Sequence, residues 1–343
     1  MRIATLGDSS HIRSLTLLLC GLWICAYSDA AETRLPTVPT SDEGAPPKAA
    51  AAADTRAATS SAHFHHVHLN VTDPKSTIAF YVKFFGASEV NYRGLSAGLF
   101  TEKSFILLSK VATPAPTNLG TSLWHIGWSG VDGHDEFAWR TREGIGVQTP
   151  VTPFGDNYYM YFWGPNREVI EVWTANKNHR FEHVHLLARN LGSTLSWFRE
   201  HLGLTQLLPA SEMVTGVATN YIRVDNVSIS VMELPKSGQP RPSWWPAEVA
   251  DSMQRTDGTA IDHIAFSYTD ISPVFRQMRD SGVTLVHPIL QSAEYGLTSF
   301  FVRGPDGLLV EVVQEPSIPE GVWQRPAGFR DSGATGSLLN SVK

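Results

Sequence analysis

The sequence predicts an α+β protein made of two homologous domains, and three observations carry this prediction. First, four short segments recur in the same order in the two halves of the chain. Second, these segments include strand patterns, in which apolar and polar residues alternate, and helix patterns with apolar residues three or four apart. Third, the 343 residues have 42% hydrophobic side chains and a net charge of -6, a globular composition long enough for two domains. The mild negative charge offers no basic stripe, so we expect no nucleic-acid partner.

Residues 1–30 have the pattern of a cleaved secretory signal peptide. Basic residues precede an apolar run at residues 15–27, and the segment ends in the small residue Ala30. The run is too short to span a bilayer, so we expect no membrane span after cleavage and a periplasmic or secreted protein. An uncleaved anchor is the alternative.

The two cysteines of the chain, Cys20 and Cys25, both lie in this leader. The mature protein would therefore contain no disulfide, no thiolate ligand and no cysteine nucleophile. Residues 31–62 are rich in Ala, Pro, Thr and Ser, which indicates a disordered linker. Residues 317–343 have a similar composition and are expected to form a flexible tail.

The internal repeat sets the predicted domain boundaries. The matching pairs of segments are 66–73 with 183–190, 80–90 with 197–207, 123–132 with 261–270, and 162–173 with 302–313. We therefore place the first domain at residues 63–177 and the second at residues 178–316. Both lengths fall in the usual range for one domain.

Each domain opens with a predicted strand that is followed by a helix. In HVHLNV, at residues 66–71, polar and apolar residues alternate, so the two histidines and the asparagine share one face of a strand. Asp73 and Pro74 then supply an N-cap and a proline for the first helical turn. Gly86 ends the predicted helix, and Gly203 ends its counterpart in the second domain.

Two histidines and one glutamate recur at matching positions of the two domains: His66, His125 and Glu171 in the first, and His183, His263 and Glu311 in the second. The spacings agree apart from an insertion in the second domain. Two imidazoles and a carboxylate form a facial set that leaves open positions on a divalent metal. A glutamate between apolar neighbours is costly to bury unless it meets a cation, which favours a metal ligand. The alternative is that these are polar residues at strand ends that both halves inherited.

On these residues and motifs the chain resembles the vicinal oxygen chelate superfamily, which includes glyoxalase I, bleomycin-resistance proteins and type I extradiol dioxygenases. The resemblance covers residues 63–316 and implies two tandem domains of this type, with four βαβββ modules whose curved mixed sheets surround a cavity. It implies metal ligands on the first, fifth and eighth strands, which are the six residues above. It also implies that His68, His185 and Tyr161 lie beside the ion, whereas His63 and His65 take no part.

Within the superfamily, glyoxalase I resembles the first half of the chain through HVHLNV and through TIAFYVKFFGA at residues 77–87. This resemblance predicts a lyase or isomerase that acts on a small carbonyl-containing or enediol-forming substrate. The cofactor would be a divalent ion of iron, zinc, nickel or manganese that acts as a Lewis acid. Glu171 and Glu311 are then the candidate catalytic bases.

Glyoxalase I has a fourth ligand, a glutamate on the fourth strand, and Glu233 is the candidate for it here. The comparable position of the first domain is Ser109. If the two halves exchange ligands across their interface, His183, Glu233, His125 and Glu171 would form a four-ligand site.

Two other functions stay open within the resemblance. Extradiol dioxygenases also have a 2-His-1-Glu set, but their signature places a histidine and a tyrosine before the last turn. Phe301 stands at the tyrosine position, and the first domain keeps Tyr161 but lacks the histidine. A small-molecule binding or sequestering protein is the third class, although such relatives generally lack the metal ligands. In each case we expect a small-molecule partner and a monomer or homodimer.

The insertion at residues 234–258 is a candidate lid over the second domain's site. Trp244 and Trp245 stand between Pro242 and Pro246, which puts two large apolar rings in a stiffened loop. Lids often exclude water from a site. The alternative is a surface loop packed on the domain interface.

Overall fold

The computed structural model describes residues 62–315, apart from 95, 102–103, 118–119, 177, 206, 209–216, 237–252 and 295. The predicted leader, the predicted tail and nearly all of the linker lie outside the described residues. Trp244 and Trp245 also lie outside them, so the lid remains a prediction. Within the described part of the chain, no helix combines the length and apolar character needed to cross a bilayer.

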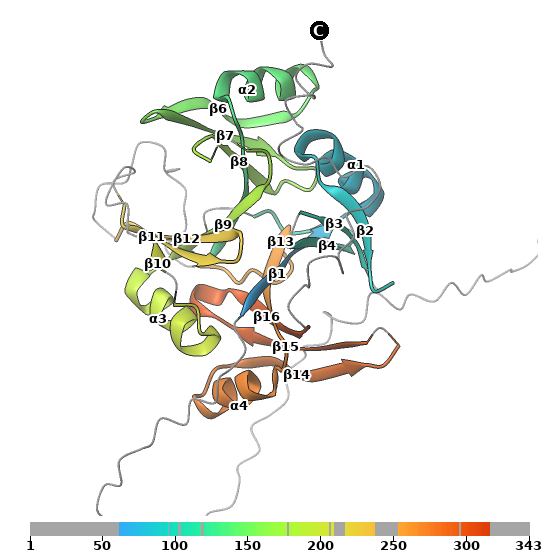
Figure 1. Ribbon diagram of the computed structural model, residues 1–343, viewed down its shortest axis with the longest axis vertical. Coiled ribbons are helices and arrows are strands. Elements are labelled where there is room, and N and C mark those ends of the chain that lie inside the picture. Colours follow the sequence, from blue (N-terminus) through green and yellow to red (C-terminus); the bar gives the residue numbers. More distant parts are fainter. Residues whose placement is uncertain are drawn as a thin grey trace, which may run out of the picture. The chain divides into compact units, whose positions relative to one another are not determined.

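One unit, a strand, a helix and three further strands, occurs four times along the described chain (Figure 1). The first module is β1 (His63–Val71), α1 (Pro74–Phe85), β2 (Ser88–Tyr92), β3 (Ser96–Phe100) and β4 (Phe105–Lys110). The second is β5 (Leu123–Ser129), α2 (Gly133–Arg142), β6 (Gly146–Phe154), β7 (Asn157–Trp163) and β8 (Val169–Trp173). The third is β9 (Phe181–Ala188), α3 (Leu191–Leu202), β10 (Leu207–Leu208), β11 (Thr219–Val224) and β12 (Val227–Glu233). The fourth is β13 (Ile261–Tyr268), α4 (Ser272–Asp280), β14 (Leu285–Ser292), β15 (Leu297–Arg303), the short 3-10 helix η1 (Pro305–Gly307) and β16 (Leu309–Gln314).

Each of the two eight-stranded sheets combines two modules. One sheet has the order β14-β15-β16-β13-β1-β4-β3-β2 and so joins the fourth module to the first. The other has the order β10-β11-β12-β9-β5-β8-β7-β6 and joins the third module to the second. At the centre of each sheet the leading strands pair antiparallel, β1 with β13 (Figure 1) and β5 with β9. Within each module, the leading strand pairs in parallel with the last strand.

This arrangement confirms the predicted fold class, an α+β protein of four βαβββ modules with mixed sheets. It also shows that each sheet takes strands from both sequence repeats. The boundary between residues 177 and 178 therefore separates the repeats, and it stays a prediction as a division between domains.

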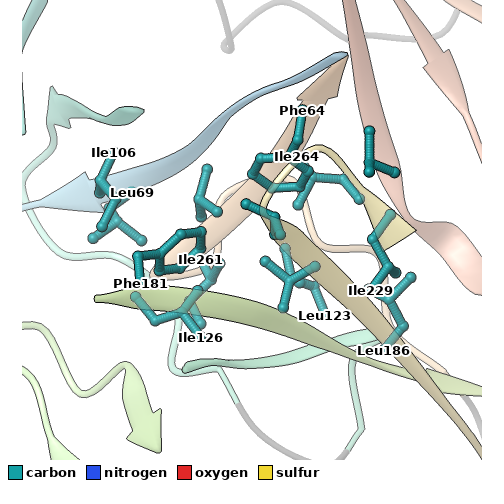
Figure 2. Close-up of a cluster of buried hydrophobic side chains, with 14 of the residues drawn as sticks. Phe64, Leu69, Ile106, Leu123, Ile126, Phe181, Leu186, Ile229, Ile261 and Ile264 are labelled. Atoms are coloured by element: carbon teal, nitrogen blue, oxygen red, sulfur yellow. The ribbon is translucent and has the colours of Figure 1, made fainter. Parts of the chain in front are cut away.

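The apolar faces of the central strands of both sheets meet in one core. Figure 2 shows side chains of β1 and β13 near those of β5 and β9: Phe64, Leu69, Ile261 and Ile264 from one sheet, and Leu123, Ile126, Phe181 and Leu186 from the other. The rings of Phe64 and Phe181 lie 6.3 Å apart between centroids. Burying one such side chain contributes about 1.5–3 kcal/mol. Since this core takes the apolar face of each strand, the polar residues occupy the opposite face.

The predicted ends of α1 and α3 are confirmed. The side chain of Asp73 accepts a hydrogen bond from the backbone N–H of Lys75 at 3.1 Å. Gly86 ends α1 with φ 64°, and Gly203 ends α3 with φ 70°. Both angles lie in the left-handed region that favours glycine.

A β-bulge precedes each of the four predicted histidine ligands. The leading strands read FHHV at residues 64–67, LWHI at 123–126, FEHV at 181–184 and IDHI at 261–264, and the strand pairing shifts at the second residue of each motif. The apolar first and last residues of all four motifs are in the core. The bulge residue and the histidine after it therefore lie together on the opposite face, where a regular strand would place only one of them.

Candidate metal centres

The structure brings the six predicted ligands together in two groups, one on each sheet. The Glu311 site contains His66 of β1, His263 of β13 and Glu311 of β16. The Glu171 site contains His125 of β5, Glu171 of β8 and His183 of β9. Neither group consists of one sequence repeat. The antiparallel pairing of the leading strands exchanges one histidine between repeats, as the alternative with exchanged ligands required.

In the Glu311 site, three potential ligand atoms surround one point. The Nε2 atoms of His66 and His263 are 3.3 Å apart. Glu311 Oε2 lies 3.3 Å from the first and 3.4 Å from the second. All three residues are buried. Their potential ligand atoms therefore lie close together with little access to water.

The Glu171 site has the same composition with shorter separations. Glu171 Oε2 lies 2.7 Å from His125 Nε2 and 3.0 Å from His183 Nε2. The two Nε2 atoms are 3.3 Å apart.

These separations fit the ligands of a single divalent ion. Ligand atoms about 2.1 Å from one ion lie about 3.0 Å apart at octahedral angles and about 3.4 Å apart at tetrahedral angles. Two imidazole nitrogens and one carboxylate oxygen suit zinc, nickel, manganese and iron(II). The residues of each site would therefore hold one such ion with positions left open.

The electrostatics of the Glu171 site also favour a cation. Burial alone would raise the pKa of Glu171, but its hydrogen bonds with His125 and His183 hold the pKa well below its usual range. Burial alone would lower the pKa of His183, but Glu171 and Glu182 raise it to about 10. The site thus keeps a buried carboxylate charged by holding a proton on a neighbouring imidazole, and a divalent ion would replace that proton.

The Glu311 site follows the same pattern. Burial opposes a charge on His263, yet Asp262 and Glu311 raise the pKa of its imidazole to about 9. For His66 burial prevails and lowers the pKa to about 3.

His68 and His185 lie beside the two sites, as the resemblance implied. The ring of His68 stacks on that of His263 at 4.7 Å, and the ring of His185 lies 4.7 Å from that of His125. Each offers a nitrogen within 4.8 Å of ligand atoms of its site. Burial is the main cause that lowers the pKa of His68 to about 4 and that of His185 well below its usual range. Both imidazoles are therefore neutral at pH 7, and each keeps one nitrogen lone pair.

Tyr161 also lies at its predicted place, beside the Glu171 site. It pairs in register with Glu171, and its ring is 5.3 Å from that of His125. In the Glu311 site the matching residue is Phe301, which pairs with Glu311 and lies 5.4 Å from the ring of His263. At this position the two sites therefore differ by one phenolic hydroxyl.

The structure places Glu233 away from the ligands. Its Oε2 accepts a hydrogen bond from the backbone N–H of Leu191 at 3.0 Å, at the start of α3. On β12 the residue opposite His185 is Ser230, and Glu233 lies three positions further, on the other face. The same register makes Lys110 the counterpart of Glu233, so the predicted correspondence with Ser109 is wrong by one residue.

His63 and His65, both expected to take no part, differ in the structure. His63 contacts Asp225 at 3.0 Å on the partly exposed start of β1. His65 is buried, and its Nδ1 lies 2.7 Å from His66 Nδ1, so the prediction for His65 is wrong. Strict alternation places His65 on the apolar face, whereas the bulge turns it toward His66. The recurring apolar–x–His–apolar pattern was the signal that could have revealed this.

Gly127 provides the space for the His183 imidazole. A Cβ at this position would lie 2.1 Å from Cε1 and 2.3 Å from Nε2 of His183. We expect Gly127→Ala to displace the ring and to remove metal from the Glu171 site only, lowering the metal content of the loaded protein to about half. Elemental analysis checks this, with Gly192→Ala as the control because a Cβ there meets nothing closer than 3.6 Å. Full metal content in Gly127→Ala would contradict the assigned geometry.

Comparison with known proteins agrees with this architecture. Residues 180–312 match the family model of the Glyoxalase/Bleomycin resistance protein/Dioxygenase superfamily. No curated protein matches the chain in sequence.

Two solved structures illustrate the likeness in fold. Glyoxalase I from Zea mays superposes with a TM-score of 0.58 at 14% identity, covering 82% of this chain and 96% of the maize chain. A protein from Bacillus subtilis subsp. subtilis str. 168, named as a candidate dioxygenase, superposes with a TM-score of 0.53 at 14% identity, covering 80% and 92%. At such identities the likeness establishes the fold alone. Residues 180–312 carry the pattern of the glyoxalase, bleomycin-resistance and dioxygenase superfamily, and the described residues share its fold, which confirms the predicted resemblance to the vicinal oxygen chelate superfamily.

Proposed function

We propose that this protein is a divalent-metal-dependent lyase or isomerase that binds a small substrate through two adjacent oxygen atoms and transfers a proton within it. The observation that carries this proposal is the convergence of two Nε2 atoms and one carboxylate oxygen, 2.7–3.4 Å apart, in each site. A bound ion would supply Lewis-acid polarisation of the substrate oxygens. Three protein ligands leave room for two such oxygens.

The chain's own residues supply the proton acceptor. Glu171 and Glu311 remain candidate bases, but each carboxylate also faces two histidines of its site. His185 and His68 lie beside the ligand histidines, and each offers a further lone pair that could take the proton or join the ligands of the ion. Ser109 Oγ, 2.7 Å from His68 Nε2, orients that imidazole.

A second candidate is iron(II)-dependent oxygen chemistry, which one observation favours. Among the described residues, no carboxylate from β4 or β12 joins either site, so each site has one carboxylate, Glu171 or Glu311, among its possible ligands. Two histidines and one carboxylate with open positions are typical of non-haem iron(II) oxygenases. Tyr161 adds a phenol beside the Glu171 site.

Deuterium exchange separates the two candidates. Metal-free protein is loaded separately with zinc, nickel, manganese or anaerobic iron(II), then incubated in D₂O with a panel of small α-hydroxycarbonyl compounds. We expect exchange at the carbon next to the carbonyl with at least one ion, without oxygen uptake. The control is a double variant, Glu171→Ala with Glu311→Ala, which should exchange nothing. Oxygen consumption with iron alone would favour the second candidate, and ligand binding without exchange or oxygen uptake would indicate a sequestering protein.

Export is part of the same proposal and rests on the leader pattern at residues 1–30. We expect the native protein to begin near Ala31 and to be recovered from the periplasm or the medium. Mass spectrometry of the intact native protein checks this. A chain that retains Met1 and remains in the cytoplasm would refute export without affecting the metal sites.

A further inference from the structure

Each ligand histidine has a second ring nitrogen, and the contact of that atom differs between the two sites. A neutral histidine that binds an ion through Nε2 carries its proton on Nδ1. In a buried ring this proton needs an acceptor, which fixes the tautomer and the ring orientation. The bulge residue before each histidine is the nearest residue that can supply this hydrogen-bond acceptor. These four bulge residues are His65, Trp124, Glu182 and Asp262.

In the Glu311 site, Asp262 holds His263. Nδ1 of His263 lies 2.7 Å from Asp262 Oδ1, and Asp262 is only 3% exposed. The other carboxylate oxygen, Oδ2, accepts hydrogen bonds from Asn70 Nδ2 at 2.8 Å and from the backbone N–H of Gly258 at 2.6 Å. The carboxylate is thus fixed on both sides, and His263 Nε2 is left facing the site.

His65 holds the other histidine of the same site, His66. Nδ1 of His66 lies 2.7 Å from Nδ1 of His65, and Nε2 of His65 lies 2.7 Å from Glu315 Oε2. Tyr92 donates to the same oxygen at 2.7 Å, and Arg93 donates to Glu315 Oε1 at 2.8 Å. If His66 donates from Nδ1 and His65 from Nε2, every one of these contacts has one donor and one acceptor. This proton arrangement leaves His66 Nε2 free to bind an ion.

In the Glu171 site one support is longer and the other is missing. Nδ1 of His183 lies 3.8 Å from Glu182 Oε2, beyond hydrogen-bond distance, and Ser129 Oγ already donates to that oxygen at 3.0 Å. His125 is fully buried, and its Nδ1 has no hydrogen-bond partner in the described part of the chain. The bulge residue before it is Trp124, whose indole can donate a hydrogen bond but cannot accept one.

We infer that the two sites are unequal, with His65 and Asp262 acting as positioning residues that make the Glu311 site the tighter one for divalent ions. This inference rests on the proposed function, namely that both sites bind metal. Removing the partner of a metal-bound histidine typically weakens metal affinity about 10- to 100-fold. We therefore expect the Glu311 site to bind an ion at least about tenfold more tightly than the Glu171 site.

Cobalt titration of single-site variants tests this directly. Glu171→Ala leaves the Glu311 site intact, and Glu311→Ala leaves the Glu171 site intact. Metal-free samples are titrated with Co²⁺, and the visible absorption band reports both the Kd and the geometry of the ligands. We expect a Kd at least about tenfold lower in Glu171→Ala.

Variants of the bulge residues then identify the cause. In the Glu171→Ala background, His65→Phe keeps the ring volume and removes the acceptor, so its Kd is expected to rise about 10- to 100-fold with a changed absorption band. His63→Phe, the same substitution two residues earlier on β1, is the control and should change neither. Asp262→Asn keeps an acceptor oxygen and should retain more affinity than Asp262→Leu.

Equal affinities in the two single-site variants, or tighter binding in Glu311→Ala, would overturn the inference. If His65→Phe fails to fold, the comparison of the single-site variants still decides. Absence of Co²⁺ binding in the unaltered protein would instead refute the proposed function, and the inference with it.

Discussion

Replacing His66 and Glu171 together is expected to abolish metal binding, although both residues belong to the first sequence repeat. His66 lies in the Glu311 site and Glu171 in the other, so this double variant damages both sites. Replacing His66 and Glu311 together, one residue from each repeat, should damage a single site and leave one ion per chain. Removing one of three protein ligands weakens binding severely, which makes the difference in stoichiometry large.

Elemental analysis of the alanine variants after loading with excess zinc and desalting measures this stoichiometry. His63→Ala is the matched control, because His63 contacts Asp225 outside either site. The single variants His183→Ala and Glu311→Ala should each lose about one ion. If the double variant at His66 and Glu171 still binds one ion per chain, the ligands of each site come from one repeat. An unchanged number of ions per chain in all variants would refute the assignment of these residues as ligands.

Arg140→Leu is expected to lower the free energy of unfolding at pH 7 by less than the about 3–5 kcal/mol typical of a buried ion pair that loses one partner, because Glu136 keeps its contact with His179. Arg140 and Glu136 pair on α2, and both are buried, at 3% and 4% exposure. The guanidinium also lies 5.2 Å from the ring of Phe85 and 4.9 Å from that of Trp139. Urea unfolding measures the loss, and Arg142→Leu, an exposed arginine of the same helix, should change little.

The pH dependence of this loss identifies its cause. Burial alone would raise the pKa of Glu136, but Arg140 and His179 lower it to about 2. A lowered carboxyl pKa contributes stability that is present above the ordinary value of about 4.5 and is lost as the pH falls toward 2. The difference between the unaltered protein and Arg140→Leu should therefore narrow as the pH is lowered from about 5 toward 2. A difference that stays constant with pH would assign the loss to packing of the arginine stem.

The repeat was the most informative part of the sequence. It paired each predicted ligand of the first half with a counterpart in the second, and the structure places all six in two buried groups. The two ends of α1 could also be predicted from the sequence, because Asp73 and Gly86 act through local backbone geometry. The repeat carried no information on which modules share a sheet. Pairing of β1 with β13 depends on contacts between distant segments, which leave no local pattern.

The errors at His65 and Glu233 have one cause, the period of two along a strand. A bulge adds one residue and reverses every face that follows, so alternation assigns His65 to the wrong side. On β12 neighbouring residues face opposite sides, so Glu233 points away from the site and accepts a hydrogen bond at the start of α3.

The pairing of the first module with the fourth has a consequence for how the chain folds as it is made. The sheet that holds the Glu171 site uses one continuous stretch, from β5 to β12, and can close before β13 has been synthesised. The other sheet needs β1 and β16, the first and last described strands, and its long-range contacts form slowly. Until β13 arrives, β1 has an unpaired edge open to other chains. A chain that ends before β13 would therefore contain all residues of the Glu171 site and a strand, β1, with one unpaired edge.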